Sequence, residues 1–173
     1  MDLRSRFGFH CMPFTREIEN DQQLKLSFAE EALEGLRTCL DRRMSAALIA
    51  PAGSGKTALT RRLVAGLPEA RYETTYVKVT SLSKRDMCRE IARACGADSA
   101  GTYAALVDKL QIRFSKTYGS EGRRPVIVMD EAHDIRPDVL GMLRILTNFQ
   151  MDSRLVISLV LIGQPPLAKM LAR

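Results

Sequence analysis

The chain has 173 residues, of which 46% are hydrophobic and 27% are charged, a balance typical of one folded domain rather than of a disordered chain. A domain of this size buries about 70% of its unfolded surface, so it needs no disulfide or metal for stability. The longest apolar run, residues 155–163, is too short to span a bilayer, and the N-terminus lacks the features of a secretion signal. We therefore expect a cytoplasmic protein without a membrane partner.

The formal net charge is +6 and the sequence pI is about 9.4. This balance favours a polyanionic partner, although nucleotide sites and solvated surfaces also use Lys and Arg. The four cysteines show no C-x-x-C spacing, and two histidines do not complete a metal-binding pattern. Cys88 and Cys95 lie seven residues apart on an expected helix, hence on one face, which predicts reduced and buried thiols there.

The first part of the chain, residues 1–26, contains Phe7, Phe9 and Phe14 with little periodicity. It indicates an irregular arm that packs on the core rather than a separate domain. The segment 27–30, SFAE, fits a capping box, and apolar residues then recur at helical spacing, which predicts a helix over about 28–42. We thus divide the chain into an arm, 1–26, and a core, 27–173.

A short apolar run, residues 44–50, leads into the segment APAGSGKT, and helical spacing follows up to the residue before Pro68. Strand, loop and helix in this order are typical of a phosphate-binding loop. Gly53 and Gly55 allow the tight turn in which backbone N–H groups point at phosphate oxygens. The pattern opens with Ala50 instead of glycine. Because alanine is the smallest substitute and the residue ends a strand, we expect a small adjustment and retained binding.

Two side chains of this segment have the chemistry that a magnesium nucleotide requires. Lys56 supplies a positive charge to the β and γ phosphates, and Thr57 supplies a hydroxyl for Mg²⁺. The N-terminus of the following helix adds a partial positive charge. We expect ATP to contact the whole loop and the start of its helix, namely Ala50, Pro51, Ala52, Gly53, Ser54, Gly55, Lys56, Thr57 and Ala58. A glycine-rich turn with a chance Lys-Thr pair is the alternative.

The rest of the chain alternates between expected strands and helices. Buried parallel strands are continuous apolar runs, and the crossovers between them are helical. The expected elements are a strand over 72–80, a helix from the Ser83-x-x-Asp86 cap to about residue 95, a helix over 102–118, a strand over 126–129, a helix over 137–149 and a strand over 155–162. This order predicts an α/β fold with a mostly parallel, doubly wound sheet.

Residues 125–134, PVIVMDEAHD, form a buried strand that ends in two adjacent carboxylates. Asp130 stands where the strand reaches the ligand edge of the sheet, and it is placed to orient the water ligands of Mg²⁺ opposite Thr57. Glu131 can polarise a water for in-line attack on the γ phosphate, which a hydrolase needs. The alternative is an acidic strand-to-helix turn, because Asp and Glu also favour helix N-termini.

A strand lies in sequence between Thr57 and Asp130, and this order resembles that of the additional-strand ATPases, which include the AAA+ group. Four segments, FGFHCMPFTREI, APAGSGKT, VIVMDEAHDI and LVLIGQPPL, are similar in particular to two sets of bacterial ATPases. One is classed with general secretion pathway protein A (ExeA-like), and the other comprises transposition helper proteins of the TniB, TnsC and phage Mu B kind. The likeness covers most of the chain and implies a three-layer P-loop NTPase core that hydrolyses ATP with Mg²⁺.

The resemblance also implies roles for individual segments. It places the N-terminal arm near the adenine and makes Gln164 the sensor of the γ phosphate. Reasoning from the residues agrees, because an amide that ends an apolar strand beside Asp130 faces the phosphates. The alternative is that Gln164 is only a turn residue before two prolines. Thr80 or Ser81 would restrain Glu131 by the same resemblance.

We interpret His133 as a surface or interface group rather than as a catalytic residue. The candidate catalytic groups are therefore Glu131, Lys56 and Gln164, with Thr57 and Asp130 as the magnesium site.

AAA+ proteins of this type continue past the last expected strand into an arginine-bearing helix, a fifth strand and a helical lid. This chain stops at Arg173, so we expect a core without the lid, either as a fragment or as an abbreviated protein. The arginine that would sense a neighbouring subunit is therefore not placed, and turnover is expected to depend on oligomer or DNA.

Three functions fit these features. The first is an ATP-dependent regulator of DNA transposition that assembles as a ring or filament on double-stranded DNA and recruits a transposase. Its candidate DNA contacts are Ser83, Lys84 and Arg85, although a solvated helix start explains them equally well. The second is a secretion-assembly ATPase. The third is a scaffold that nucleotide switches without hydrolysis.

Overall fold

The structure is a computed structural model that describes residues 6–9, 19–20, 22–147 and 155–172. In that part of the chain one parallel sheet carries the fold, with the strand order β1-β4-β3-β2. Its strands are β1 (Ala46–Ile49), β2 (Tyr72–Lys78), β3 (Arg124–Asp130) and β4 (Ser158–Gly163). The expected parallel α/β fold is therefore confirmed.

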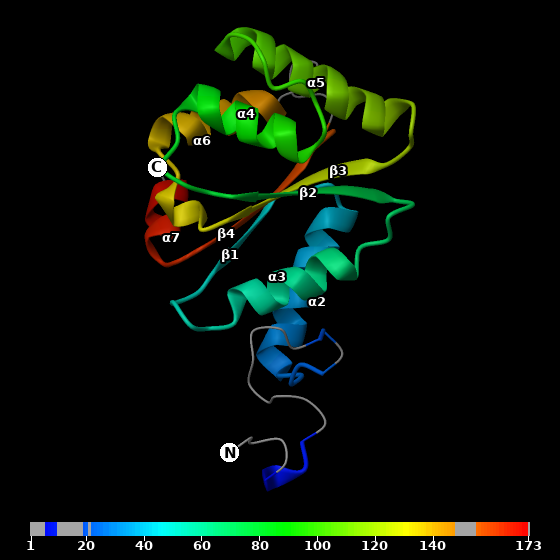
Figure 1. Ribbon diagram of the computed structural model, residues 1–173, viewed down its shortest axis with the longest axis vertical. Coiled ribbons are helices and arrows are strands. Elements are labelled where there is room, and N and C mark those ends of the chain that lie inside the picture. Colours follow the sequence, from blue (N-terminus) through cyan, green and yellow to red (C-terminus); the bar gives the residue numbers. More distant parts are fainter. Residues whose placement is uncertain (1–5, 10–18, 21, 148–154, 173) are drawn as a thin grey trace.

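The helices cover the two faces of the sheet, which gives three layers (Figure 1). On one face lie α2 (Ser27–Asp41) and α3 (Lys56–Ala65). The other face carries α4 (Lys84–Ala94), α5 (Tyr103–Gly119) and α6 (Pro137–Thr147). Two short elements flank the ligand edge: the one-turn helix η1 (Ala132–Asp134), which follows β3, and α7 (Pro166–Leu171), which follows β4.

The position of β4 brings three strand ends together. β4 is last in the sequence but lies between β1 and β3, with Ile49 opposite Gly163 and Met129 opposite Leu161. Parallel strands end at the same edge of a sheet, so the segments that follow β1, β4 and β3 are neighbours. These segments are the expected phosphate loop, the turn at Gln164 and the acidic turn after Asp130.

Alternation along the strands divides the core into two halves. On β3, Val126 and Val128 pack toward α2 and α3, whereas Ile127 and Met129 pack toward α4, α5 and α6. Cys88 and Cys95 are both buried in the second half, as the sequence predicts. Burial raises the pKa of the Cys88 thiol to about 11, because the charged thiolate is disfavoured away from water.

The expected helices and strands are all present within the described residues, with shifted ends. β1 begins at Ala46, β2 ends at Lys78 and β4 begins at Ser158. The last two residues of the expected helix over 137–149 lie outside the described part. The sequence analysis missed η1 and α7, which are too short to show a helical period.

The capping box at the start of α2 is not formed. The helix already begins at Ser27 and its N-cap is Leu26, without a side-chain cap. Ser27 therefore lies in the first turn, where its hydroxyl cannot cap the helix.

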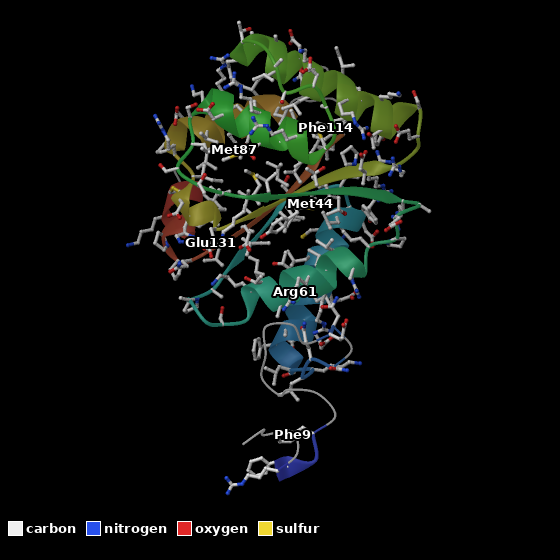
Figure 2. All side chains as sticks on the ribbon, in the orientation of Figure 1. Phe9, Met44, Arg61, Met87, Phe114 and Glu131 are labelled. Carbon is white, nitrogen blue, oxygen red and sulfur yellow. The ribbon has the colours of Figure 1, made fainter. Side chains whose placement is uncertain are left out.

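Two aromatic residues of the N-terminal arm do not pack on the core. Phe7 and Phe9 stack on each other with ring centroids 5.8 Å apart, and they are 58% and 42% exposed. Figure 2 shows Phe9 well away from the sheet. The third expected anchor, Phe14, lies outside the described residues, and the arm's place beside adenine stays a prediction.

Gly163 closes the ligand end of β4 tightly, and this yields a first prediction. A Cβ at Gly163 would lie 2.9 Å from Leu167 Cδ2 and 3.0 Å from the backbone nitrogen of His133. We expect Gly163→Ala to lower the free energy of unfolding by about 1–3 kcal/mol through overpacking, as measured by urea denaturation. The matched control is Gly35→Ala within α2, where no atom lies within 4 Å of the new Cβ. This substitution should raise the free energy of unfolding by about 0.5–1 kcal/mol. A neutral Gly163→Ala would contradict the close packing.

Candidate nucleotide-binding site

The loop between β1 and α3 has the backbone geometry of an anion-binding turn. Gly53 and Gly55 have φ angles of 77° and 85°, in the left-handed region that favours glycine. No atom lies within 4 Å of a Cβ built at either residue. Backbone conformation, not crowding, therefore requires glycine at both positions. Gly55 is also the N-cap of α3. The N–H groups of the loop therefore lie next to those at the N-terminus of the helix, where the helix dipole is positive.

Lys56 lies across the opening of this loop. Its ammonium donates hydrogen bonds to the carbonyl oxygens of Ala50 at 2.9 Å and Pro51 at 2.7 Å, and the Ser54 hydroxyl donates to Pro51 O at 2.8 Å. These contacts hold the charge over the loop rather than in open solvent. A phosphate oxygen, which is a stronger acceptor than a carbonyl, can replace one of them.

Asp130 ends β3 as the one buried carboxylate among the described residues, with 5% of the residue exposed. Its Oδ1 accepts from the Glu131 backbone N–H at 2.9 Å, and its Oδ2 accepts from the Tyr76 hydroxyl at 3.0 Å. Each oxygen still has a free lone pair. Within the described ranges no group of three acidic, His or Cys side chains could hold a metal. Carboxylate and hydroxyl oxygens such as those of Asp130 and Thr57 are donors that suit Mg²⁺, which takes one or two protein oxygens and completes its shell with phosphate and water.

The sequence analysis missed Tyr76, which connects Asp130 to the α3 side of the site. Tyr76 on β2 and Thr57 on α3 line one pocket of about 520 Å³. Burial, and then the hydrogen bond to Asp130, raise the pKa of Tyr76 to about 12. Strand alternation in the sequence places Tyr76 and Lys78 on one face of β2, but only the register of the folded sheet, in which Lys78 pairs with Asp130, puts that face beside the carboxylate.

Glu131 has an unusual backbone. Its φ of 57° and ψ of 35° are left-handed, which costs a non-glycine residue about 1–2 kcal/mol. The hydrogen bond from its N–H to Asp130 holds this turn. Its side chain is 39% exposed, at the edge of the sheet where the strands end (Figure 2). Strain of this kind gathers at functional sites.

Gln164 and His133 contact each other at the ends of neighbouring strands. The Gln164 Nε2 atom lies 2.9 Å from His133 Nε2, and the Gln164 backbone nitrogen lies 3.4 Å from His133 Nδ1. The His133 side chain is only 14% exposed. The surface part of the interpretation of His133 is therefore wrong, because sequence spacing did not reveal that β4 brings Gln164 against it; an interface role stays a prediction.

The residues after β2 lie mostly outside this cluster. Thr80 and Ser81 are exposed, and no hydrogen bond joins either side chain to Glu131 in the described chain. Ser83 caps α4 by accepting from the Asp86 N–H at 3.2 Å, and Arg85 donates to the Gly101 carbonyl. Two of the three candidate DNA contacts thus have structural partners, whereas Lys84 is exposed.

An apolar pocket of about 190 Å³ adjoins the phosphate loop. It lies between the start of α2 with the segment before it and the loop with α3. Its lining includes Leu26, Phe28, Ala29, Leu48 and Lys56. The pocket thus has an apolar wall and reaches the lysine of the loop.

These features define a P-loop nucleotide-binding domain of the additional-strand class, with β4 inserted between the strand of the phosphate loop and the strand of the acidic pair. The AAA domain family matches residues 37–171, and the chain belongs to that family. No helix in the described ranges is long and apolar enough to cross a membrane.

A curated relative and several solved structures agree with this assignment. General secretion pathway protein A of Aeromonas hydrophila is 33% identical over 135 residues, which cover 69% of this chain and 22% of that protein. The Cdc6p structure from Pyrobaculum aerophilum has a TM-score of 0.66 at 19% identity, covering 87% of this chain and 42% of that one. The Aeropyrum pernix ORC1 protein in complex with DNA has a TM-score of 0.58 at 24% identity, covering 81% and 40%.

A third solved structure, the Aeropyrum pernix ORC2 protein in ADPNP and ADP complexes, has a TM-score of 0.59 at 18% identity, covering 87% of this chain and 45% of that one. At these identities the structures support the fold alone. The chain spans less than half the length of each of these proteins.

The contact between Tyr76 and Asp130 gives a pH-dependent prediction. We expect Tyr76→Phe to lower the free energy of unfolding by about 1 kcal/mol near pH 7. The folded pKa of about 12 exceeds the ordinary value of 10, so this contribution is complete below pH 10 and falls as the pH rises toward 12. Urea denaturation across that range measures both effects. Tyr103→Phe is the control near pH 7, because the Tyr103 hydroxyl has no hydrogen bond among the described residues; burial raises the pKa of Tyr103 as well, so an equal loss near pH 7 is the result that would contradict the prediction.

Proposed function

We propose that the protein binds ATP with Mg²⁺ and hydrolyses the bond between the β and γ phosphates. One observation carries the proposal: β4 brings the acidic turn, the Gln164 turn and the phosphate loop to one edge of the sheet. Lys56 and the loop N–H groups would hold the phosphates, and Thr57 with Asp130 would hold the metal. Bound Mg²⁺ neutralises charge on the phosphate oxygens.

The acidic turn would supply the base for the attacking water. Glu131 is the half-exposed carboxylate beside Asp130, free enough to accept a proton as the water attacks in line. Gln164 would donate a hydrogen bond to a γ-phosphate oxygen. The neighbouring apolar pocket would hold the adenine, since its wall of Leu26, Phe28 and Leu48 leads to Lys56. Residues 23–26 thus form the part of the arm that meets the base.

Turnover measurements test the role of Glu131. Glu131→Gln removes the base but keeps size and hydrogen bonding, so we expect kcat to fall about 100-fold or more while ATP affinity is kept. Asp138→Asn is the matched control, because Asp138 is a partly exposed carboxylate at the start of α6, close to the same turn, and it pairs with Arg136; its turnover should match the wild type. Equal loss in both variants would assign the effect to local charge rather than to a base.

A binding measurement tests the loop separately. Lys56→Ala should lower ATP affinity about tenfold or more, because the ammonium is the loop's only fixed cation; titration with a fluorescent ATP analogue measures this. Intact ATP binding without turnover in the wild type would instead favour the nucleotide-switched scaffold.

We further propose that this ATPase acts on double-stranded DNA as a regulator of transposition. It would assemble as a ring or filament in which a second copy completes the site, and would recruit a transposase. The net charge of +6 supports a polyanionic partner. The similar ORC1 protein was solved in complex with DNA. The resemblance to transposition helper proteins supplies the biological role.

Lys84 gives the sharpest test of DNA binding. Its side chain is exposed at the start of α4, whereas Ser83 and Arg85 are engaged locally. We expect Lys84→Ala to weaken duplex binding equally across sequences and to reduce the dependence of log Kd on log salt by about one. Lys169→Ala on α7 removes the same charge elsewhere and is the control. An unchanged salt slope for Lys84→Ala would place the DNA contacts elsewhere.

A second candidate is a secretion-assembly ATPase, which the 33% identity to general secretion pathway protein A favours. ATP turnover would then be insensitive to duplex DNA, so measuring phosphate release with and without DNA separates the two candidates.

A further inference from the structure

His133 lies between the two groups that should act on the γ phosphate and its attacking water. On one side, His133 Nδ1 is 3.4 Å from Glu131 Oε2. On the other, His133 Nε2 is 2.9 Å from Gln164 Nε2. The ring is largely buried, so these contacts are shielded from water and hold their geometry better than surface pairs. The imidazole thus bridges the end of β3 and the end of β4.

The ring can connect these two groups in one orientation of its proton. When the Gln164 amide N–H donates to an unprotonated Nε2, the neutral ring carries its proton on Nδ1, facing the Glu131 carboxylate. In this tautomer Nδ1 cannot also accept the Gln164 backbone N–H, which lies 3.4 Å away, so the contact with Glu131 replaces that hydrogen bond. A chain of donors then runs from Gln164 through His133 to Glu131. Glu131 favours this tautomer because its carboxylate, 3.4 Å from Nδ1, lies closer to the ring than the Asp134 carboxylate on the other side, 3.9 Å from Nε2.

The backbone around the ring keeps the bridge short. Ala132 is fully buried, which anchors the acidic turn in the core. On the facing strand, Gly163 lets the end of β4 approach the His133 backbone nitrogen so closely that a Cβ would lie 3.0 Å from it. The turn after β3 and the turn after β4 are therefore packed against each other, with His133 between them.

We propose that His133 is a positioning residue that couples Gln164 to Glu131. It fixes the Gln164 amide so that its second N–H is free for the γ phosphate, and it transmits this arrangement to the Glu131 carboxylate. The proposal rests on the proposed ATP hydrolysis for its rate effect. It assigns to His133 the link that the sequence analysis placed at Thr80 or Ser81.

A double-mutant cycle tests this coupling. His133→Ala and Gln164→Ala are each expected to lower kcat about tenfold. Each should also reduce the preference for ATP over ADP, measured as the ratio of the two Kd values. Because both residues act through one chain of contacts, the double variant should be no worse than either single one. A role in folding alone would lower Tm without this non-additivity.

His133→Asn separates the two contacts and guards against an unfolded alanine variant. Its shorter amide reaches about as far as Nδ1 but not to Nε2, so it keeps a group near Glu131 and loses Gln164. We expect its ATP preference to match that of Gln164→Ala. Three outcomes would each overturn the coupling: effects on kcat that multiply in the double variant, wild-type behaviour of His133→Ala, or a wild-type ATP preference for His133→Asn.

The ratio of ATP to ADP affinity needs no turnover, so the coupling and the proposed hydrolysis fail separately. If the wild type does not hydrolyse ATP, the hydrolysis proposal fails and the affinity ratios still decide the coupling. If the wild type does not prefer ATP, or Gln164→Ala leaves that preference unchanged, Gln164 does not sense the γ phosphate and the coupling is overturned.

Discussion

The candidate site depends on the parallel pairing of β4 between β1 and β3. The pairing places Gly163 beside Ile49 and Leu161 beside Met129, so three chain segments far apart in sequence emerge side by side. Apart from Lys56 and Thr57 of the loop and the residues of the acidic turn, the side chains of the cluster come from parts of the chain that are distant in sequence. Backbone hydrogen bonds of the sheet therefore set the distances among the loop, the carboxylates and Gln164 to a precision that loops alone do not give.

Left-handed backbone conformations occur at both the phosphate loop and the acidic turn. Gly53 and Gly55 adopt left-handed conformations at little cost, but Glu131 adopts one at a cost that its surroundings must offset. The hydrogen bond to Asp130, the burial of Ala132 and the packing of Gly163 all act on this turn. The strain thus falls on the residue whose carboxylate must face the ligand edge while its neighbour Ala132 is buried.

The sequence predicts the fold and the glycine turn between β1 and α3 well, because both depend on local patterns. Apolar runs separated by helical periods define the parallel sheet, and APAGSGKT defines the loop by spacing alone. The contacts of Tyr76 with Asp130 and of His133 with Gln164 escape such reasoning. Each joins two strands whose neighbour relation follows from sheet order and register, and these depend on long-range packing. The failed cap at Ser27 has another cause, since a one-residue shift of the helix start removes a cap.

The alanine that opens the phosphate loop shows how register decides the effect of a substitution. The Ala50 N–H donates to Gly163 O at 3.1 Å, so this residue extends the pairing of β1 with β4. Among the described non-glycine residues, positive φ angles occur only at Arg43 and Glu131, so Ala50 needs none of the freedom of glycine. Its carbonyl accepts from Lys56 as part of the loop, a contact made by the backbone and independent of the side chain. The first residue of the loop therefore acts as the last residue of the strand, and a methyl group there leaves the geometry of Gly53, Gly55 and Lys56 intact.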